Sequence, residues 1–246
     1  MKIVIISDLH GNLEALSSLP EKFDELWVLG DLVNYGPNPA EVIDFVEANA
    51  SVVIRGNHDH AVGFDEDRRC SPPFRAMAQA MQQYTSSVLS ESQRQFLRDL
   101  PLRVDREVGG RKVSMCHAVP SDPLFAYCLP DSPRWESELD LANSDFLLVG
   151  HTHLPLHRQF GERRVVNPGS LGQPKTGTPA ACYAVWDDGM IELRSFEYPF
   201  EETIRKIDVL PIPAAIKISL ADVLRHGGLP DAARRRDLAR PTPGLR

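Results

Sequence analysis

Five stretches of apolar residues in this chain each end in a group of side chains that readily bind metal ions. The groups are Asp8-Leu9-His10, Gly30-Asp31, Gly56-Asn57-His58-Asp59, Cys116-His117 and Gly150-His151-Thr152-His153. A short, continuous apolar stretch is typical of a buried β-strand. In open α/β sheets, ligands bind beyond the carboxyl ends of the strands, so separate segments can meet at one place. The pattern therefore restricts the chain to a sheet whose strand ends converge on a single site.

The order of the expected strands and helices indicates an α/β fold. Apolar stretches at 2–7, 25–30 and 51–56 predict strands, and helices are expected from residue 11 and over 38–48 between them. Strand, helix, strand, helix, strand is the signature of this class. The pattern resumes later in the chain, where strands are expected at 112–117, 146–150, 164–166 and 182–186.

The chain is expected to contain one main domain over residues 1–198 and a C-terminal helical extension and tail over 199–246. Within the main domain, residues 60–100 interrupt the α/β pattern and predict a helical insertion close to the site. The last residues carry Arg234-Arg235-Arg236, and such a charged run near a terminus is typical of a solvated tail.

Composition and charge exclude some classes of function. The net charge of −7 argues against a nucleic-acid partner, because such proteins favour a basic surface. No apolar stretch approaches the roughly 20 residues of a membrane span, and the N-terminus lacks the pattern of a signal peptide. The four cysteines show no paired spacing. We therefore expect a cytoplasmic protein that does not bind membranes, and the sequence gives no indication of its oligomeric state.

The types of side chain in the five groups point to two metal ions that share one carboxylate. Asp8 and His10 are two residues apart, which places both on the same side just beyond a strand, and His151 and His153 repeat this spacing. Asp31 stands alone after its strand, as suits a bridging carboxylate. Imidazole and carboxylate together favour Zn, Fe or Mn over Mg or Ca. A centre with two metal ions most often cleaves phosphate esters.

The five groups together resemble the motifs of the calcineurin-like metallophosphoesterase superfamily, and the resemblance covers residues 1–198. It implies a four-layer αββα sandwich with a dinuclear metal site at the carboxyl ends of the strands. It also implies hydrolysis of a phosphate ester by attack of a metal-bound hydroxide. By this resemblance, one divalent ion would be bound by Asp8, His10, Asp31 and His153, and the other by Asp31, Asn57, His117 and His151.

Two further residues receive roles from the resemblance. His58 would protonate the leaving alkoxide or hold the phosphate, without binding metal. Arg55 would bind the substrate phosphate, because a guanidinium fork fits two phosphoryl oxygens; a strand-end Arg that faces outward is the alternative. The protein serine/threonine phosphatases of the superfamily have an Asp and an Arg where this chain has Asn34 and Tyr35. Asn34 cannot stabilise a charged His58 as an Asp would, and Asn34 and Tyr35 are expected near the substrate.

The sequence favours a small phosphorylated molecule or a nucleotide monoester as the substrate. A phosphodiester or a dinucleoside polyphosphate is an alternative, as is phosphoserine or phosphothreonine in proteins, which the change at Asn34 disfavours. A scaffold without activity is a further alternative, but no expected ligand is missing. Residues 34–39 and 167–172 resemble a prokaryotic branch of small phosphoesterases, and the second segment is expected either to form a tight turn or to shape the site.

Overall fold

The computed structural model describes residues 1–67, 69 and 72–229 of the 246-residue chain. The arginine-rich tail that the sequence predicts lies outside these residues. Among the described helices, none has the length and apolar character needed to cross a bilayer. The described cysteines, Cys116, Cys128 and Cys182, form no disulfide.

The first sheet contains the first three strands of the chain, which run parallel, and two later strands that join at one edge. The order is β10-β9-β1-β2-β3, and β9 pairs antiparallel with both β1 and β10. Its strands are β1 (Lys2–Ile6), β2 (Glu25–Val28), β3 (Val52–Val53), β9 (Ala181–Asp187) and β10 (Met190–Phe196).

The second sheet has a parallel centre and an antiparallel strand at each edge. Its order is β4-β5-β6-β8-β7, in which β5, β6 and β8 run parallel. Its strands are β4 (Arg103–Val108), β5 (Arg111–Cys116), β6 (Phe146–Leu148), β7 (Leu156–Phe160) and β8 (Arg163–Asn167).

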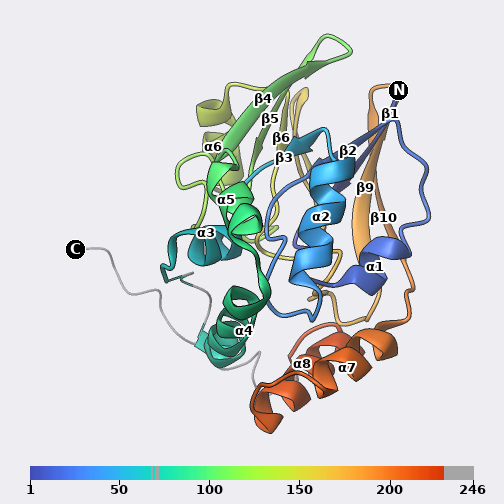
Figure 1. The fold of residues 1–246 in the computed structure, drawn as a ribbon. Helices are drawn as coiled ribbons and strands as arrows, with labels where there is room; N and C mark the ends of the chain where they lie inside the picture. The colour runs from blue at the N-terminus through green and yellow to red at the C-terminus, as the bar shows by residue number, and fades with distance from the viewer. Residues whose placement is uncertain (68, 70–71, 230–246) are drawn as a thin grey trace.

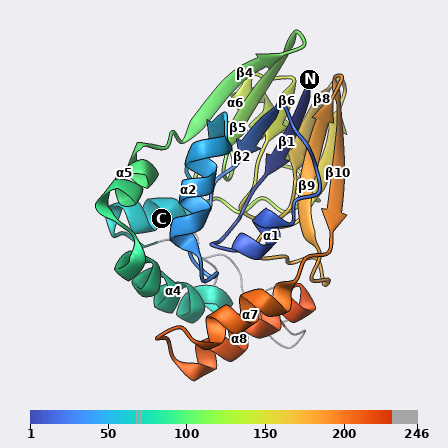
Figure 2. The same cartoon turned by 45° about the vertical axis from the view of Figure 1, so that its right-hand side comes forward.

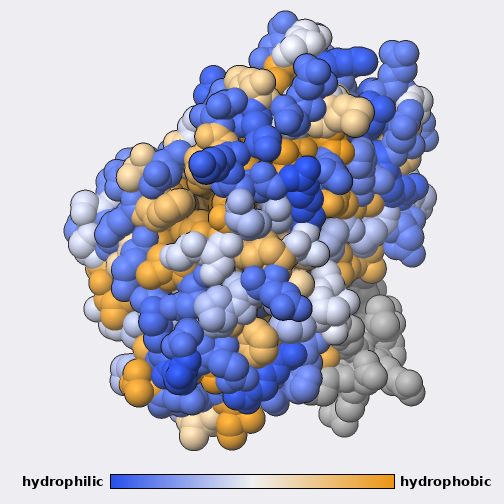
Figure 3. All heavy atoms as spheres, turned by 90° about the vertical axis from the view of Figure 1, so that its right-hand side faces the viewer, coloured by the Kyte–Doolittle hydropathy of each residue, from blue (hydrophilic) through white to orange (hydrophobic). Residues whose placement is uncertain are grey.

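The two sheets pack face to face, and helices cover both outer faces (Figures 1 and 2). Residues such as Ile5, Trp27 and Met115 fill the space between the sheets. Helices α1 (Leu13–Ser17) and α2 (Pro39–Asn49) cover the first sheet, and α6 (Trp135–Ala142) covers the second. The expected four-layer αββα sandwich is therefore confirmed. Figure 3 shows one face of the molecule, on which hydrophilic side chains predominate.

The remaining helices gather at the end of the sandwich where the parallel strands terminate. Helices α7 and α8 share one hydrophobic cluster with α4 and with Tyr35, a residue of the loop after β2. The C-terminal extension thus packs directly on a segment beside the site, while its separation from the main domain at residue 198 stays a prediction. The elements are α3 (Asn57–Phe64), a 3-10 turn (Pro72–Phe74), α4 (Arg75–Val88), α5 (Glu91–Asp99), α7 (Phe200–Asp208) and α8 (Ala214–His226).

Candidate metal centre

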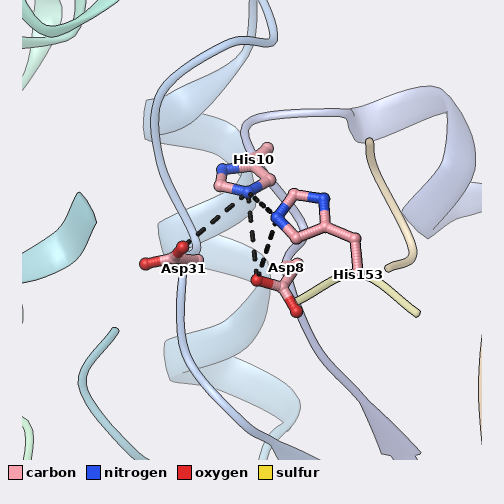
Figure 4. A group of neighbouring side chains, drawn as sticks. All are labelled: Asp8, His10, Asp31 and His153. Carbon is pink, nitrogen blue, oxygen red and sulfur yellow. Dashed lines mark hydrogen bonds and ion pairs between the residues drawn. The ribbon is translucent and has the colours of Figure 1, made fainter. Parts of the chain in front are cut away.

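The side chains that follow five parallel strands meet in one buried cluster. Figure 4 shows one part of it, in which two carboxylates and two imidazoles point toward one another. Asn57 joins the other part, since its Oδ1 lies 3.0 Å from His151 Nδ1 and 3.2 Å from His117 Nε2. Two overlapping groups each have ligand atoms within 4.8 Å of one another: Asp8, His10, Asp31 and His153, and Asp31, His117 and His151. All seven side chains expected to bind metal are thus brought together.

The loops that carry these side chains hold an unusual backbone conformation. Five of the seven residues have φ in the left-handed region, with values of 53° at Asp8, 47° at His10, 55° at Asp31, 66° at His151 and 61° at His153. Non-glycine residues seldom adopt this region, and such strain persists only where surrounding contacts enforce it. Here the turn after β1 is bonded to the turn after β2, by Asp8 N to Gly30 O at 3.0 Å and by His10 N to Asp31 O at 2.9 Å.

Backbone carbonyls orient three of the imidazoles. His10 Nδ1 donates to Val33 O at 2.9 Å, His117 Nδ1 to Leu29 O at 2.7 Å and His153 Nδ1 to Gln173 O at 2.7 Å. In a neutral ring, a proton on Nδ1 leaves a lone pair on Nε2. The Nε2 atoms of His10 and His153 therefore face the cluster as potential metal ligands. Burial would lower the pKa of His117, but Asp31 and Asp8 raise it to about 9, so its Nε2 would release a proton on binding a metal ion. The hydrogen bond at Nδ1 fixes the direction of each ring.

Burial strongly perturbs the ionisation of the cluster. It lowers the pKa of His10 to about 4 and that of His151 to about 3, so these rings are neutral and available as ligands. Burial also raises the pKa of Asp8 to about 7. Burial would raise the pKa of Asp31 too, but the neighbouring His117 and His58 hold it well below its usual value. Asp31 therefore carries a full negative charge at the centre of the cluster.

Several atoms of the cluster lack a hydrogen-bond partner, as expected for atoms that bind a cation. Asp8 Oδ1 and His151 Nε2 are buried and form no hydrogen bond. His10 Nε2 lies only 3.2 Å from His153 Nε2, although both rings already donate through Nδ1. Two lone pairs then face each other, and a cation would relieve their repulsion. The donor set of imidazole nitrogens and carboxylate and amide oxygens suits divalent transition-metal ions.

Asp59 supports the centre from behind without contacting the ligand atoms. Its Oδ2 accepts from Asp31 N at 2.7 Å and from Gly56 N at 2.9 Å, and its Oδ1 accepts from Leu32 N at 2.8 Å. The carboxylate therefore ties the loop after β2 to the start of α3. Asp59 is thus the member of the Gly56–Asp59 motif that braces the centre through backbone amides.

Gly56 is required because Asp31 packs directly on its backbone. A Cβ atom on Gly56 would lie 2.1 Å from Asp31 Oδ1 and 2.4 Å from Asp31 N. We expect Gly56→Ala to displace the Asp31 carboxylate and to lower kcat by about 10²-fold, since a shift of about 1 Å has effects of this size. Bound metal, measured by elemental analysis, should fall in parallel. Gly63→Ala in α3 is the matched control, because its nearest neighbour is the flexible side chain of Arg98 at 3.2 Å; equal activity in both variants would contradict the prediction.

The loop after β2 places Asn34 and Tyr35 behind two histidines. Asn34 is fully buried, and its Nδ2 donates to His58 Nδ1 at 2.9 Å. Tyr35 is 5% exposed, and its ring centroid lies 4.9 Å from that of His10 and 5.0 Å from that of His58. Both residues thus contact His58, and their expected contact with substrate stays a prediction.

Arg55 and Lys175 are the two cations of interest near the centre. The Arg55 guanidinium donates to Arg98 O at 2.8 Å and lies over the Phe64 ring, 5.0 Å from its centroid. Lys175 was not identified from the sequence, although it lies just beyond residues 167–172. Its ammonium lies 4.6 Å from the Phe74 centroid, and its charge adds to the effect of burial in lowering the pKa of His153.

Residues 167–172 brace the centre as well as forming a turn. Asn167 Nδ2 donates to Gly150 O at 2.6 Å, and Ser170 Oγ donates to Asp8 O at 2.7 Å. Gly172 N donates to the same carbonyl at 3.0 Å, and a Cβ atom on Gly172 would lie 1.8 Å from Leu9 O. The segment therefore connects the loops after β1 and β6, in line with the interpretation that it shapes the site.

This chain is similar to a known family domain and to two curated proteins. The model of the calcineurin-like phosphoesterase superfamily domain matches residues 1–188. An uncharacterized protein of Methanocaldococcus jannaschii, MJ0912, is 31% identical over 229 residues, which cover 83% of this chain and 91% of that protein. Phosphodiesterase YfcE of Escherichia coli is 30% identical over 208 residues, covering 78% of this chain and 91% of YfcE.

A solved structure extends this agreement to the fold. The metallophosphoesterase from Sphaerobacter thermophilus is 28% identical and superimposes with a TM-score of 0.77, covering 90% of this chain and 99% of that one. The arrangement of the motifs, the buried cluster and these matches lead to the same assignment. The chain belongs to the calcineurin-like phosphoesterase superfamily and is a metal-dependent enzyme that hydrolyses phosphoric esters.

Proposed function

We propose that the protein binds two divalent transition-metal ions and hydrolyses the phosphate monoester of a small molecule or nucleotide. The observation that carries this proposal is the presence of Asp31 in both ligand groups, since a shared carboxylate is what a pair of ions requires. Asp8, His10 and His153 complete one proposed ion site, and Asn57, His117 and His151 complete the other. Mn, Fe and Zn all suit these ligands.

Two bound ions would supply positive charge to the phosphoryl oxygens and lower the pKa of a coordinated water. The chain itself contributes orientation and a dry environment. The ligand side chains are nearly inaccessible to solvent, with no more than 3% exposure at His151 and His153. Electrostatic interactions are stronger in such a low-dielectric site than in water. The rigid loops bonded to each other keep the ligands in place without reorganisation.

His58 is proposed to act on the substrate through Nε2. Its Nδ1 lies 2.9 Å from the Asn34 amide group, which donates through Nδ2 or, when rotated, accepts through Oδ1, a buried atom with no other hydrogen-bond partner. The neutral amide supplies no negative charge to stabilise an imidazolium. This arrangement favours a role in which His58 donates a hydrogen bond to the phosphate over one in which it acts as a strong acid.

A cation beside the ions favours monoesters, because a monoester phosphate carries a second negative charge. We propose Lys175 for this role. Its positive charge helps to lower the pKa of His10 and His153 in one proposed ion site and of His151 in the other. Arg55 is the residue suggested by the superfamily pattern, and its Nη1 donates to Arg98 O while its buried Nε has no hydrogen-bond partner. The phosphodiesterase activity in the name of YfcE makes a diester the second candidate.

The proposal is tested by comparing p-nitrophenyl phosphate with bis(p-nitrophenyl) phosphate in the presence of Mn²⁺, Zn²⁺ or Fe²⁺. We expect the monoester to be the better substrate with at least one ion. Lys175→Ala should lower kcat/KM for the monoester by about tenfold, because it removes one charge-assisted contact of about 1.5 kcal/mol, and should change the diester rate little. Arg55→Ala is the matched comparison. A better rate with the diester would reject the monoester proposal, and a larger effect of Arg55→Ala would assign the phosphate contact to Arg55.

A further inference from the structure

The segment between β5 and α6, residues 117–134, lies beside one side of the metal centre and is held in place by its own contacts. Ala118 N donates to Pro123 O at 2.8 Å, and Phe125 N donates to Asp122 Oδ1 at 3.1 Å. Farther along, Trp135 Nε1 donates to Leu129 O at 2.9 Å. The part of the segment between these contacts is therefore a fixed wall of the site.

Tyr127 presents an exposed aromatic ring from this wall directly beside a ligand residue. Its ring centroid lies 4.1 Å from that of His151, with an angle of 37° between the two planes. Tyr127 is 41% exposed, whereas Tyr35, which packs against His10 and His58, is 5% exposed. Tyr127 therefore packs against a ligand residue and is also partly exposed to solvent.

A second group of aromatic rings continues the same wall toward α3. The Phe125 ring lies 6.1 Å from His60, and His60 lies 4.8 Å from Phe64, which is 43% exposed. These rings belong to the helix that begins with Asn57 and His58 and to the segment that carries Tyr127. Guanidinium groups lie over two of these rings, Arg69 over Phe125 at 4.6 Å and Arg55 over Phe64 at 5.0 Å, so Tyr127 is the ring of this group that contacts a ligand residue.

We infer that Tyr127 forms a stacking site for a planar, aromatic leaving group, so that the enzyme prefers nucleotides to sugar phosphates. This inference rests on the proposed phosphoesterase function of the centre. A nucleobase stacks on an exposed aromatic ring largely irrespective of its hydrogen-bonding groups. A leaving group without an aromatic ring gains no comparable stacking energy from this wall. The preference is therefore set by the non-reacting part of the substrate.

The test uses adenosine 5′-monophosphate and ribose 5-phosphate, which share the phosphate and the ribose and differ in the base. With the Mn²⁺-loaded protein, we expect lower KM for the nucleotide. Tyr127→Ala should raise this KM by about tenfold, in the range that base stacking supplies, and should leave KM for ribose 5-phosphate within about twofold. Tyr127→Phe keeps the ring and should behave as the wild type. Leu129→Ala, which truncates another exposed side chain of the same segment, is the control.

Binding measurements separate this inference from the function on which it rests. Both ligands are titrated calorimetrically into the metal-loaded His58→Ala variant, with and without Tyr127→Ala. Tighter binding of the nucleotide that is lost in Tyr127→Ala would support the stacking site. If the wild-type protein hydrolysed neither compound, that result would count against the monoester proposal and not against the stacking site. Equal binding of the two ligands, or an equal loss for both in Tyr127→Ala, would overturn the inference and leave Tyr127 as a cover for His151.

Discussion

Replacing Asp31 by Asn is expected to abolish nearly all activity, with kcat lower by about 10³-fold or more, because the loss of a shared ligand removes several kcal/mol of transition-state stabilisation. The Asp31 carboxylate lies 3.3 Å from His117 Nε2 and 3.8 Å from His10 Nε2. In the variant, Oδ1 can still accept from His58 N, which is 2.8 Å away in the native protein. The amide nitrogen would then point into the cluster, where it cannot bind a cation.

The activity loss should be accompanied by loss of metal. Elemental analysis is expected to find about two ions per chain in the wild type and one or fewer in the variant. Asp24→Asn is the matched control, since Asp24 is an exposed carboxylate just before the same strand and bonds to Lys2 N at 2.8 Å. A variant at Asp31 that keeps both ions and more than a tenth of the activity would show that this residue does not bridge them.

Removal of the ions is expected to lower the melting temperature by roughly 15–30 °C. Each ion present at about 1,000 times its Kd stabilises the native state by about 4 kcal/mol, and each kcal/mol shifts the melting temperature of a chain of this size by about 2–4 °C. Without cations, only neighbouring imidazoles compensate the charge of Asp31, and the nitrogens of His10 and His153 face each other at 3.2 Å with no cation between them.

Calorimetry before and after dialysis against a chelator measures this change. Addition of Mn²⁺ should restore both the melting temperature and the activity, which excludes irreversible damage. The Asp31→Asn variant provides the control, because a protein that no longer binds both ions should respond much less to the chelator. If chelation empties the wild-type protein of metal and shifts its transition by only a few degrees, the centre is not a major source of stability.

The ligand cluster could be predicted from sequence because each member follows a strand of the parallel part of a sheet. Apolar stretches before Asp8, Asp31, Asn57 and His117 mark those strands, and parallel strands end at the same edge. Lys175 and Tyr127 could not be found in this way. Both lie in irregular segments whose approach to the centre depends on tertiary contacts, and no local pattern distinguishes them from other surface residues.

Edge strands were the main structural feature that the sequence did not reveal. The unpredicted strands β4, β7 and β10 all lie at the edge of a sheet, where one side of the strand is open and polar residues are tolerated. Strand β4, with the sequence RVDREV, is mostly exposed. In contrast, the strand expected at 51–56 is only two residues long, because the chain turns at Gly56 to begin α3. Apolar stretches therefore identify the central strands and the apolar edge strand β3, and they overlook edge strands rich in polar residues.

The division of the centre between two sheets has a consequence for how the protein is made. Asp8, His10 and Asp31 belong to the first sheet, and His153 completes their group from the second. A nascent chain emerging from the ribosome therefore presents an incomplete set of ligands until His153 has been synthesised. The neighbour of β1 on its other side, β9, emerges later still. We therefore expect stable capture of metal to await synthesis of the strands of both sheets.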